Sequence, residues 1–368
     1  MKFLAKSTSL VALAAALSGM SLSASAQEVL NIYNWSDYIG EETVANFEAE
    51  YGVKVNYDVY DSNQVVEAKL LAGNSGYDLV VPTLADAKRL IEGGIFQKID
   101  KSKLENYGNL DPVILKQTTK DDPENAYAVP YLWGTNGYGY NVAKVKELLG
   151  DDAPVDSWAL IFDPKYAEPL SKCGLTLLDD PGEIVPLVNF YLGNVTDGAP
   201  TSESIATAMA ELEKIRPFIT YFHSSQYIND LANGNVCVSV GWSGDVGQAS
   251  TRAAEAENGV ELEYVIPKEG TLIWFDMMMI PADAPNPDLA HKFIDYILRA
   301  DVGADLVNYV EYAGPNLAAM DLISDEIKEN PGIFPNQEVK ERLRSKVEPG
   351  PRELRERTRL WTRLKTGQ

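Results

Sequence analysis

The sequence contains few residues of the types that carry covalent or metal chemistry. Its 368 residues include two histidines and two cysteines. Two histidines leave little for general acid–base catalysis, and there is neither a Gly-x-Ser-x-Gly nucleophile motif nor phosphate-loop spacing. His223 and His291 show no ligand spacing with the cysteines, so we expect no metal site and no cofactor. The composition therefore predicts a protein that is not an enzyme.

Positive charge is also scarce. The chain has 32 lysines and arginines against 54 aspartates and glutamates, a formal net charge of −22. Nucleic acid and anionic membranes are therefore poor partners, whereas the long-range field favours a cationic ligand. The acidity would equally serve to keep an exported protein soluble, so charge alone does not identify the ligand.

Long apolar runs are confined to the N-terminus. Lys2 and Lys6 flank the start of the chain, residues 10–17 are apolar, and Ala24-Ser25-Ala26 fits a small-x-small cleavage site. This pattern predicts a secretory signal peptide over residues 1–26, too short and wrongly flanked to span a membrane. We therefore expect a soluble, periplasmic mature protein. In that oxidising compartment the pair Cys173 and Cys237 is expected to form a disulfide, the alternative being two buried thiols.

The order of predicted elements indicates an α/β protein. Strand patterns at 29–33, 53–57 and 77–82 alternate with helical patterns and glycine stops. Such alternation predicts a parallel α/β sheet, whose ligands bind at the carboxyl ends of the strands, and Trp35 and Thr83 directly follow two of them. The length favours two domains. The glycine- and aromatic-rich segment 131–140 is either a crossover between them or a strand pair with a tight turn.

Three short motifs combine aromatic residues with a carboxylate. Asp245 follows Trp242 by three residues, Asp276 follows Trp274 by two, and the segment 33–38 contains two tyrosines, a tryptophan and an aspartate. Aromatic rings pack on methylenes and attract ammonium groups, while carboxylates balance their charge. The combination predicts a receptor for a small organic cation, although sugars also stack on tryptophan and bond to carboxylates.

Together the motifs resemble those of the periplasmic polyamine-binding proteins, the putrescine- and spermidine-binding components of ATP-driven (ABC) importers. The matching stretches are 33–39, 127–137, 221–225, 241–246, 274–276, 280–284 and 358–363. The resemblance implies a two-lobed solute-binding protein fold with a hinge and an interlobe cleft. It implies one lobe from 27–135 with 255–309 and another from 136–254 with 310–368. It also implies a monomer that delivers a polyamine to membrane permease subunits of an ABC transporter.

The resemblance further implies the ligand contacts. Trp35, Trp242, Trp274 and Tyr312 correspond to the aromatic walls of the cleft. The acidic residues Asp245 and Asp276 correspond to the contacts for one amino end of the ligand, and Glu183 to the contact for the other. The remaining polar contacts to the ammonium groups would come from Ser36, Asp37, Tyr38 and Thr83, with Ser224 and Tyr227 as supporting residues. Asp37 could equally cap the following turn.

Two positions depart from the family pattern. Thr83 replaces the common serine, and its methyl group narrows the pocket. Trp274 stands where some relatives have phenylalanine, and its longer platform suits a longer amine such as spermidine.

Other functions remain open from the residues alone. Glu183 and Asp245 could form the carboxylate pair of a hydrolase. A binding protein could instead take a sugar, a cationic amino acid derivative or ferric ion, the last through Tyr138 and Tyr140. A polyamine receptor could also report to a signalling partner instead of a transporter.

Overall fold

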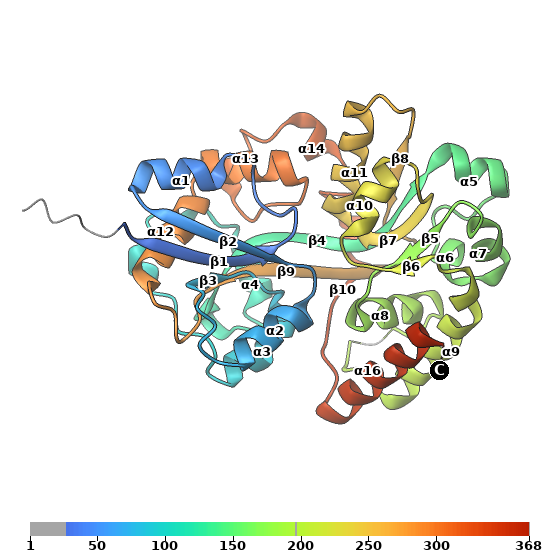
Figure 1. The fold of residues 1–368 in the computed structure, drawn as a ribbon, viewed down its shortest axis with the longest axis horizontal. Helices are drawn as coiled ribbons and strands as arrows, with labels where there is room; N and C mark the ends of the chain where they lie inside the picture. Colours follow the sequence, from blue (N-terminus) through green and yellow to red (C-terminus); the bar gives the residue numbers. More distant parts are fainter. Residues whose placement is uncertain (1–26, 196, 368) are drawn as a thin grey trace, which may run out of the picture.

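The structure, a computed structural model, describes residues 27–195 and 197–367 and has two halves joined by long strands (Figure 1). The predicted signal peptide lies outside the described residues. The strands are β1 (Val29–Trp35), β2 (Lys54–Tyr60), β3 (Leu79–Val80), β4 (Ala128–Asn141), β5 (Leu175–Leu177), β6 (Tyr221–Phe222), β7 (Val238–Trp242), β8 (Leu262–Val265), β9 (Thr271–Met279) and β10 (Leu343–Ser345). None of the described helices is long and apolar enough to cross a membrane.

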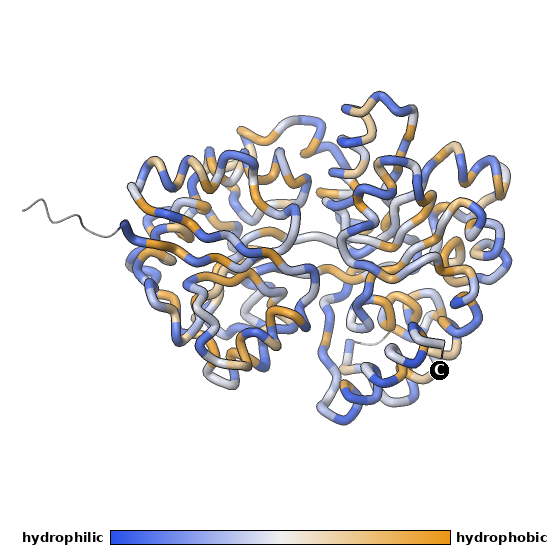
Figure 2. Tube along the Cα trace, in the orientation of Figure 1, coloured by the Kyte–Doolittle hydropathy of each residue, from blue (hydrophilic) through white to orange (hydrophobic). Residues whose placement is uncertain are grey.

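The helices surround this sheet in both halves (Figure 1). They are α1 (Thr43–Tyr51), α2 (Asn63–Leu71), α3 (Leu84–Glu92), α4 (Pro112–Thr118), α5 (Val142–Leu149), α6 (Ala159–Phe162), α7 (Pro164–Leu170), α8 (Pro181–Tyr191), α9 (Ser202–Ile215), α10 (Gln226–Ala232), α11 (Ser243–Glu255), α12 (Pro287–Ile297), α13 (Ala300–Val310), α14 (Asp325–Glu329), α15 (Gln337–Lys340) and α16 (Pro351–Thr366). Hydrophobic residues concentrate along the strands, and hydrophilic residues are frequent on the outer helices and loops (Figure 2). The apolar face of α12, including Leu289, Phe293 and Ile297, is buried.

The sheet is mixed in direction. Its strand order is β2-β1-β3-β9-β4-β7-β5-β6, with β10 beside β9 and β8 beside β4. The first three strands pair in parallel, which confirms the prediction for that part of the chain. The long strands β4 and β9, however, are antiparallel to each other, and β9 is antiparallel to β3. The sheet therefore combines parallel pairs in each half with an antiparallel centre.

Strands β4 and β9 cross from one half to the other. On β4, Trp133 packs in the hydrophobic cluster of the first half, whereas Tyr138 packs in that of the second. Between them lies Gly134, where an added Cβ would come within 2.7 Å of the Trp274 ring. Glycine is required there because the neighbouring strand's indole lies against the backbone. The segment 131–140 was predicted to be either a crossover or a strand pair with a tight turn. It is a crossover, formed by one continuous strand.

The two hydrophobic clusters differ from the predicted lobe boundaries in two places. The first cluster gathers residues within 30–133 and 274–333, and the second gathers residues within 138–262 together with Leu272, Trp361 and Leu364. Ile323 and Ile333 therefore pack with the first cluster, although the resemblance assigned 310–368 to the second lobe. Leu262 packs with the second cluster, although 255–309 was assigned to the first. The physical reason is that β8 pairs with the distal end of β4, while α13 and α14 cover the first cluster.

The predicted disulfide is present in the second half. Cys173 follows α7 and Cys237 precedes β7, and the two are bonded with their Cα atoms 5.5 Å apart. The bond ties the end of a helix to a central strand of this half.

Candidate ligand-binding site

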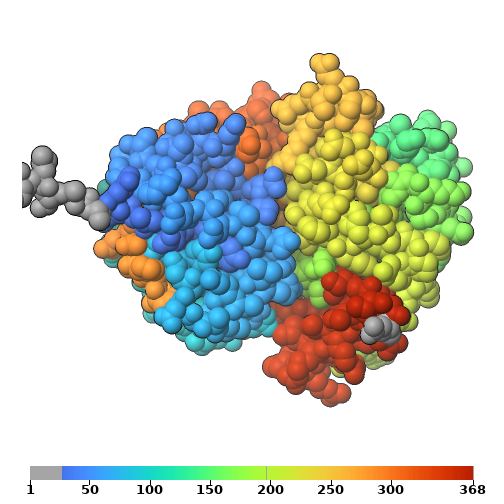
Figure 3. Space-filling model, viewed as in Figure 1, coloured from blue at the N-terminus to red at the C-terminus, as the bar shows by residue number. Residues whose placement is uncertain are grey.

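A cavity lies between the two halves, where the carboxyl ends of β1 and β7 meet β9. Its empty space is about 500 Å³, part of it open to solvent. In the space-filling view, the blue N-terminal segments and the yellow segments around α10 meet along this boundary (Figure 3). The cavity is lined by Trp35, Ser36, Tyr38, Tyr60, Asp61, Asn63, Thr83, Glu183, Ser224, Ser225, Ile228, Trp242, Asp245, Trp274, Asp276 and Tyr312. Every predicted ligand contact except Asp37 is therefore among its lining residues.

Aromatic rings form two groups in the cavity wall. The rings of Trp35 and Trp242 come from opposite halves, with centroids 5.8 Å apart and planes inclined at 68°. The rings of Trp274 and Tyr312 have centroids 5.5 Å apart, and Tyr38 meets Tyr312 edge-on at 5.0 Å. The first pair is partly exposed, whereas the second group is buried. The wall therefore offers ring surface contributed by both halves.

Asp245 is a buried carboxylate held by two tyrosines. The hydroxyl of Tyr227 donates to one carboxylate oxygen at 2.6 Å, and the hydroxyl of Tyr312 donates to the other at 2.5 Å. Burial raises the pKa of Asp245 to about 6, although both hydrogen bonds favour the ionised form. Tyr227, expected to be a supporting residue, orients Asp245 without itself lining the cavity.

Asp276 is a second buried carboxylate, and a hydrogen-bond chain through Thr83 and Asn63 holds it in place. It lies two residues from Trp274 on β9, so both side chains project from the same face. The Thr83 hydroxyl donates to Asp276 at 2.6 Å, and Asn63 donates to the same hydroxyl at 3.1 Å. Burial raises the pKa of Asp276 to about 7. Thr83 keeps the hydroxyl of the serine that is common at this position in the family, and this hydroxyl binds the carboxylate of Asp276.

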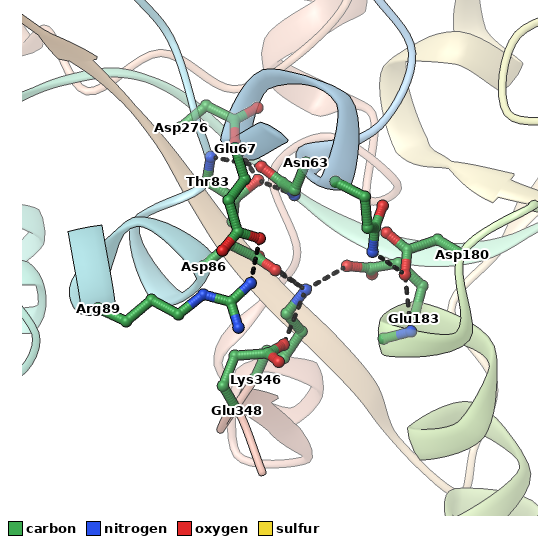
Figure 4. A network of polar contacts seen from close by, with 12 residues as sticks. Asn63, Glu67, Thr83, Asp86, Arg89, Asp180, Glu183, Asp276, Lys346 and Glu348 are labelled. Atoms are coloured by element: carbon green, nitrogen blue, oxygen red, sulfur yellow. Dashed lines mark hydrogen bonds and ion pairs between the residues drawn. The ribbon is translucent and has the colours of Figure 1, made fainter. Parts of the chain in front are cut away.

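Glu183 differs from these two carboxylates because a cation already contacts it. One of its oxygens lies 3.2 Å from the Lys346 ammonium, and its other oxygen has no hydrogen-bond partner among the described residues. Burial raises the pKa of Glu183, and the neighbouring lysine opposes that rise. Figure 4 shows Glu183 and Asp86 directed at the lysine from two different helices.

Two of the cavity carboxylates, Glu183 and Asp245, lie at helix N-termini. Glu183 lies in the first turn of α8, which begins with Pro181, and Asp180 accepts from the Gly182 amide as its cap. Asp245 lies in the first turn of α11, directly after the strand that ends at Trp242. The unpaired amides and dipole of a helix start favour a negative charge there.

Asp37, which was expected to contact the ligand, is not among the residues that line the cavity. Its side chain is outside the cavity lining, and it accepts a hydrogen bond from Arg252 of α11 at 2.8 Å. Its backbone adopts φ 53°, a left-handed conformation that aspartate tolerates better than most residues. This turn aims the carboxylate across the boundary between the halves instead of into the cavity. Asp37 therefore forms an ion pair between the halves.

Several lining residues were not found from the sequence. Tyr60 ends β2, Asp61 follows it and Asn63 begins α2, so the rule that ligands bind at the carboxyl ends of strands could have selected them. Ile228 and Ser225 carry no chemical pattern that would distinguish them from core residues. Their places in the wall depend on how α10 packs beside α11.

The ferric interpretation loses its candidate residues, because neither Tyr138 nor Tyr140 lines the cavity. Tyr138 is fully buried in the second half and donates to the Val155 carbonyl, and Tyr140 bonds to Glu263 away from the cavity. Glu183 and Asp245, the proposed carboxylate pair of a hydrolase, both line the cavity, and Glu183 also contacts Lys346.

Comparison with known proteins supports the resemblance seen in the motifs. The putrescine-binding periplasmic protein PotF of Escherichia coli is 52% identical over 94% of this chain and 93% of its own length. The putrescine-binding periplasmic protein SpuD of Pseudomonas aeruginosa is 46% identical over 100% of both chains. The solved spermidine/putrescine ABC transporter substrate-binding protein PotD of Streptococcus pneumoniae, 29% identical, matches 92% of this chain and 99% of that chain with a TM-score of 0.73.

A sequence model of one family spans most of the chain. It matches residues 42–335, which include all the cavity-lining residues except Trp35, Ser36 and Tyr38. The matched family has solute binding, not catalysis, as its defining property. The structure agrees with that description, because two lobes meet at a cavity and long strands cross between them. The chain belongs to the family of bacterial extracellular solute-binding proteins.

Proposed function

We propose that this protein is a periplasmic receptor for a polyamine such as putrescine or spermidine, which it delivers to an ABC importer. The observation that carries the proposal is the state of Asp245 and Asp276. Both are buried at the cavity, both have a raised pKa, and neither forms an ion pair among the described residues. An ammonium group provides the missing positive charge, and its donors match the carboxylate oxygens.

The aromatic walls support an alkylamine over a bare metal cation. A chain of methylenes packs between Trp35, Trp242 and Trp274, and the ring faces attract the ammonium ends. Each such contact contributes about 0.5–2 kcal/mol, the larger value applying where water is excluded. The third carboxylate, Glu183, adds a further acceptor to the cavity wall. Two charged ends joined by an apolar middle describe a polyamine.

Domain closure is the proposed mode of capture. We infer that the lobes comprise residues 27–133 with 274–334, and residues 138–272 with the C-terminal helix α16, joined at Gly134, Ile273 and the segment before β10. Because the lining comes from both lobes, closing them removes water from the ligand and strengthens each charged contact. A monomer in the closed form would then dock on the permease subunits.

The test is a calorimetric and thermal-unfolding screen with putrescine, cadaverine, agmatine, spermidine and spermine. A ligand that binds only the folded state raises the unfolding midpoint, and a hundredfold excess over Kd adds about 2.7 kcal/mol. We expect at least one amine to bind and raise the midpoint. The absence of any shift at millimolar amine would refute the proposal.

Butanediol is the matched control ligand, because it has the carbon skeleton of putrescine with hydroxyl groups in place of ammonium groups. It should neither bind nor shift the midpoint, since it cannot balance the charge of Asp245 and Asp276. Equal shifts with the diol and the diamine would favour a receptor for hydroxylated ligands such as sugars.

A further inference from the structure

The exposed face of the C-terminal helix carries a row of arginines on an otherwise acidic protein. Helix α16 has six basic residues against two acidic ones, whereas the whole chain has a formal net charge of −22. Arg352, Arg355, Arg359 and Arg363 recur at intervals of three or four residues, and all four are exposed. Residues at these intervals lie on one face of a helix. The four side chains therefore form one continuous row, called the arginine row below.

The opposite face of α16 packs against the second half. Trp361 and Leu364 belong to its hydrophobic cluster, and the Trp361 indole donates to Asp179 at 2.9 Å. On the same buried face, Arg357 forms an ion pair with Glu348 at 3.0 Å. Figure 3 shows the red C-terminal segment on the surface of the second half. Because the apolar face is fully used in packing, what α16 offers to a partner is the arginine row.

The arginine row has few partners within the protein. The side chains of Arg352, Arg355 and Arg359 form no ion pair or hydrogen bond with the described residues. The Arg363 guanidinium lies 3.8 Å from Glu213, and both side chains are more than half exposed. Like charges at these intervals destabilise a helix, and Arg352 lies in the first turn, where the helix dipole disfavours a positive charge. An unfavourable row without internal partners indicates a partner outside the chain.

Guanidinium groups indicate an oxyanion partner. The planar fork of arginine binds a carboxylate or a phosphate through two parallel hydrogen bonds, a geometry that lysine does not match. The row extends about 16 Å along the helix axis, which suits several carboxylates along a helix or loop of another protein. An anionic membrane fits less well, because it repels the strongly negative chain and because the apolar face of α16 is buried.

The helix that carries the row lies close to the boundary between the lobes. Trp361 binds Asp179, and the next residue, Asp180, accepts a hydrogen bond at 3.1 Å from Gln64 of the first lobe. Closure of the lobes would change the position of α16 relative to α2, which carries Gln64. A partner that contacted the row and reached across this boundary would bind the closed form with a different affinity from the open form.

We propose that the arginine row is the surface of the second lobe that docks on an acidic protein surface. This inference rests on the proposed function, under which that acidic surface belongs to the permease subunits of the importer. It specifies which part of this chain the permease recognises and that the permease supplies carboxylates. The row lies outside the ligand cavity, so docking and amine binding can be separated by mutation.

The test is amine-dependent ATP hydrolysis by the polyamine importer of the source bacterium, reconstituted in proteoliposomes of neutral phosphatidylcholine. The triple variant Arg352→Glu with Arg355→Glu and Arg359→Glu should require at least about tenfold more receptor for half-maximal stimulation, because like charges then face each other. Its affinity for putrescine, measured by calorimetry on the full mature chain, should change less than about twofold, since surface substitutions away from a site have small effects.

The matched control is the triple variant Lys116→Glu with Lys120→Glu and Lys292→Glu. These three lysines are exposed on the first lobe, and their side chains form no ion pair with the described residues. The control therefore makes the same change of net charge on another surface. It should leave the half-maximal receptor concentration unchanged, because a docking contact acts locally whereas net charge acts through the long-range field.

The outcomes separate the two proposals. If no amine binds the native protein, or if the liganded protein fails to stimulate the importer, the proposed function itself is wrong. If the native protein binds and stimulates but charge reversal of the row has no effect, or the control has an equal effect, only the docking role is refuted. Binding to phosphatidylglycerol vesicles that charge reversal abolishes, with stimulation unchanged, would assign the row to a lipid surface and overturn the permease contact.

Discussion

Replacing Asp245 by asparagine tests the central charge of the site. The carboxylate is buried, and the variant removes its charge while keeping its shape and its neighbours Tyr227 and Tyr312. Losing one partner of a buried, hydrogen-bonded charge pair costs about 3 kcal/mol or more, which corresponds to about a hundredfold in Kd. Asp276 remains to hold the ammonium, so the loss should lie near the lower end of that range.

The same substitution should stabilise the unliganded protein. Asp245 has its pKa raised from 3.8 to about 6 by burial, so its charge opposes folding near neutral pH. Asparagine resembles the protonated acid, and the gain is up to about 3 kcal/mol, two pKa units at 1.36 kcal/mol each. Thermal unfolding without ligand should therefore show a midpoint no lower than that of the native protein, while the shift produced by putrescine nearly disappears.

Asp37→Asn is the matched control. It makes the same chemical change in an ion pair with Arg252 whose side chains are 39% and 32% exposed. Such pairs contribute about 0–1 kcal/mol, so affinity should change less than about fivefold. Equal losses of affinity in the two variants by calorimetry would show that Asp245 has no special role. A lowered midpoint in unliganded Asp245→Asn would show that its charge does not oppose folding.

Three further predictions concern pH, the disulfide and the wall. Affinity for putrescine should fall by up to about a thousandfold between about pH 8 and pH 5, because Asp276 and Asp245, with pKa values of about 7 and 6, must be ionised to hold an ammonium. An affinity that stays constant in calorimetric titrations over this range would contradict that assignment. Reducing the bond between Cys173 and Cys237, which are 64 residues apart, should lower the free energy of unfolding by about 4 kcal/mol in denaturant titrations. An unchanged unfolding midpoint would rule out that contribution. Trp274→Phe should weaken spermidine more than putrescine, since it shortens the apolar platform, and an unchanged affinity ratio would be inconsistent with a role of the indole in selectivity.

The parts of the fold that could be predicted are those with local signals. The alternation of strands and helices predicted the parallel group β1, β2 and β3. The crossing strand β4 was ambiguous because glycines and tyrosines have no amphipathic period when every residue is buried. The lobe boundaries differed from the packing because the pairing of β8 with β4 links segments far apart in the sequence.

The residues of the candidate site can also be divided into those that the local sequence predicted correctly and those that it did not. The short motifs that ended at Asp245 and Asp276 each placed an aromatic residue and a carboxylate within a few residues, so local chemistry identified them. Asp37 showed the same local pattern, yet its left-handed turn directs it to Arg252. Local composition therefore indicates which side chains could bind an amine, but the backbone direction decides which of them line the cavity.

The sequence alone predicted the compartment of the chain, the family it resembles and, through that resemblance, a cationic ligand. These follow from composition and short motifs, which are properties of neighbouring residues. Only the tertiary structure placed Lys346 behind Glu183, because a strand near the C-terminus pairs with β9 and carries the lysine to carboxylates 163 and 260 residues away. Burial then gives that one charge its strength, since few water molecules remain to screen it.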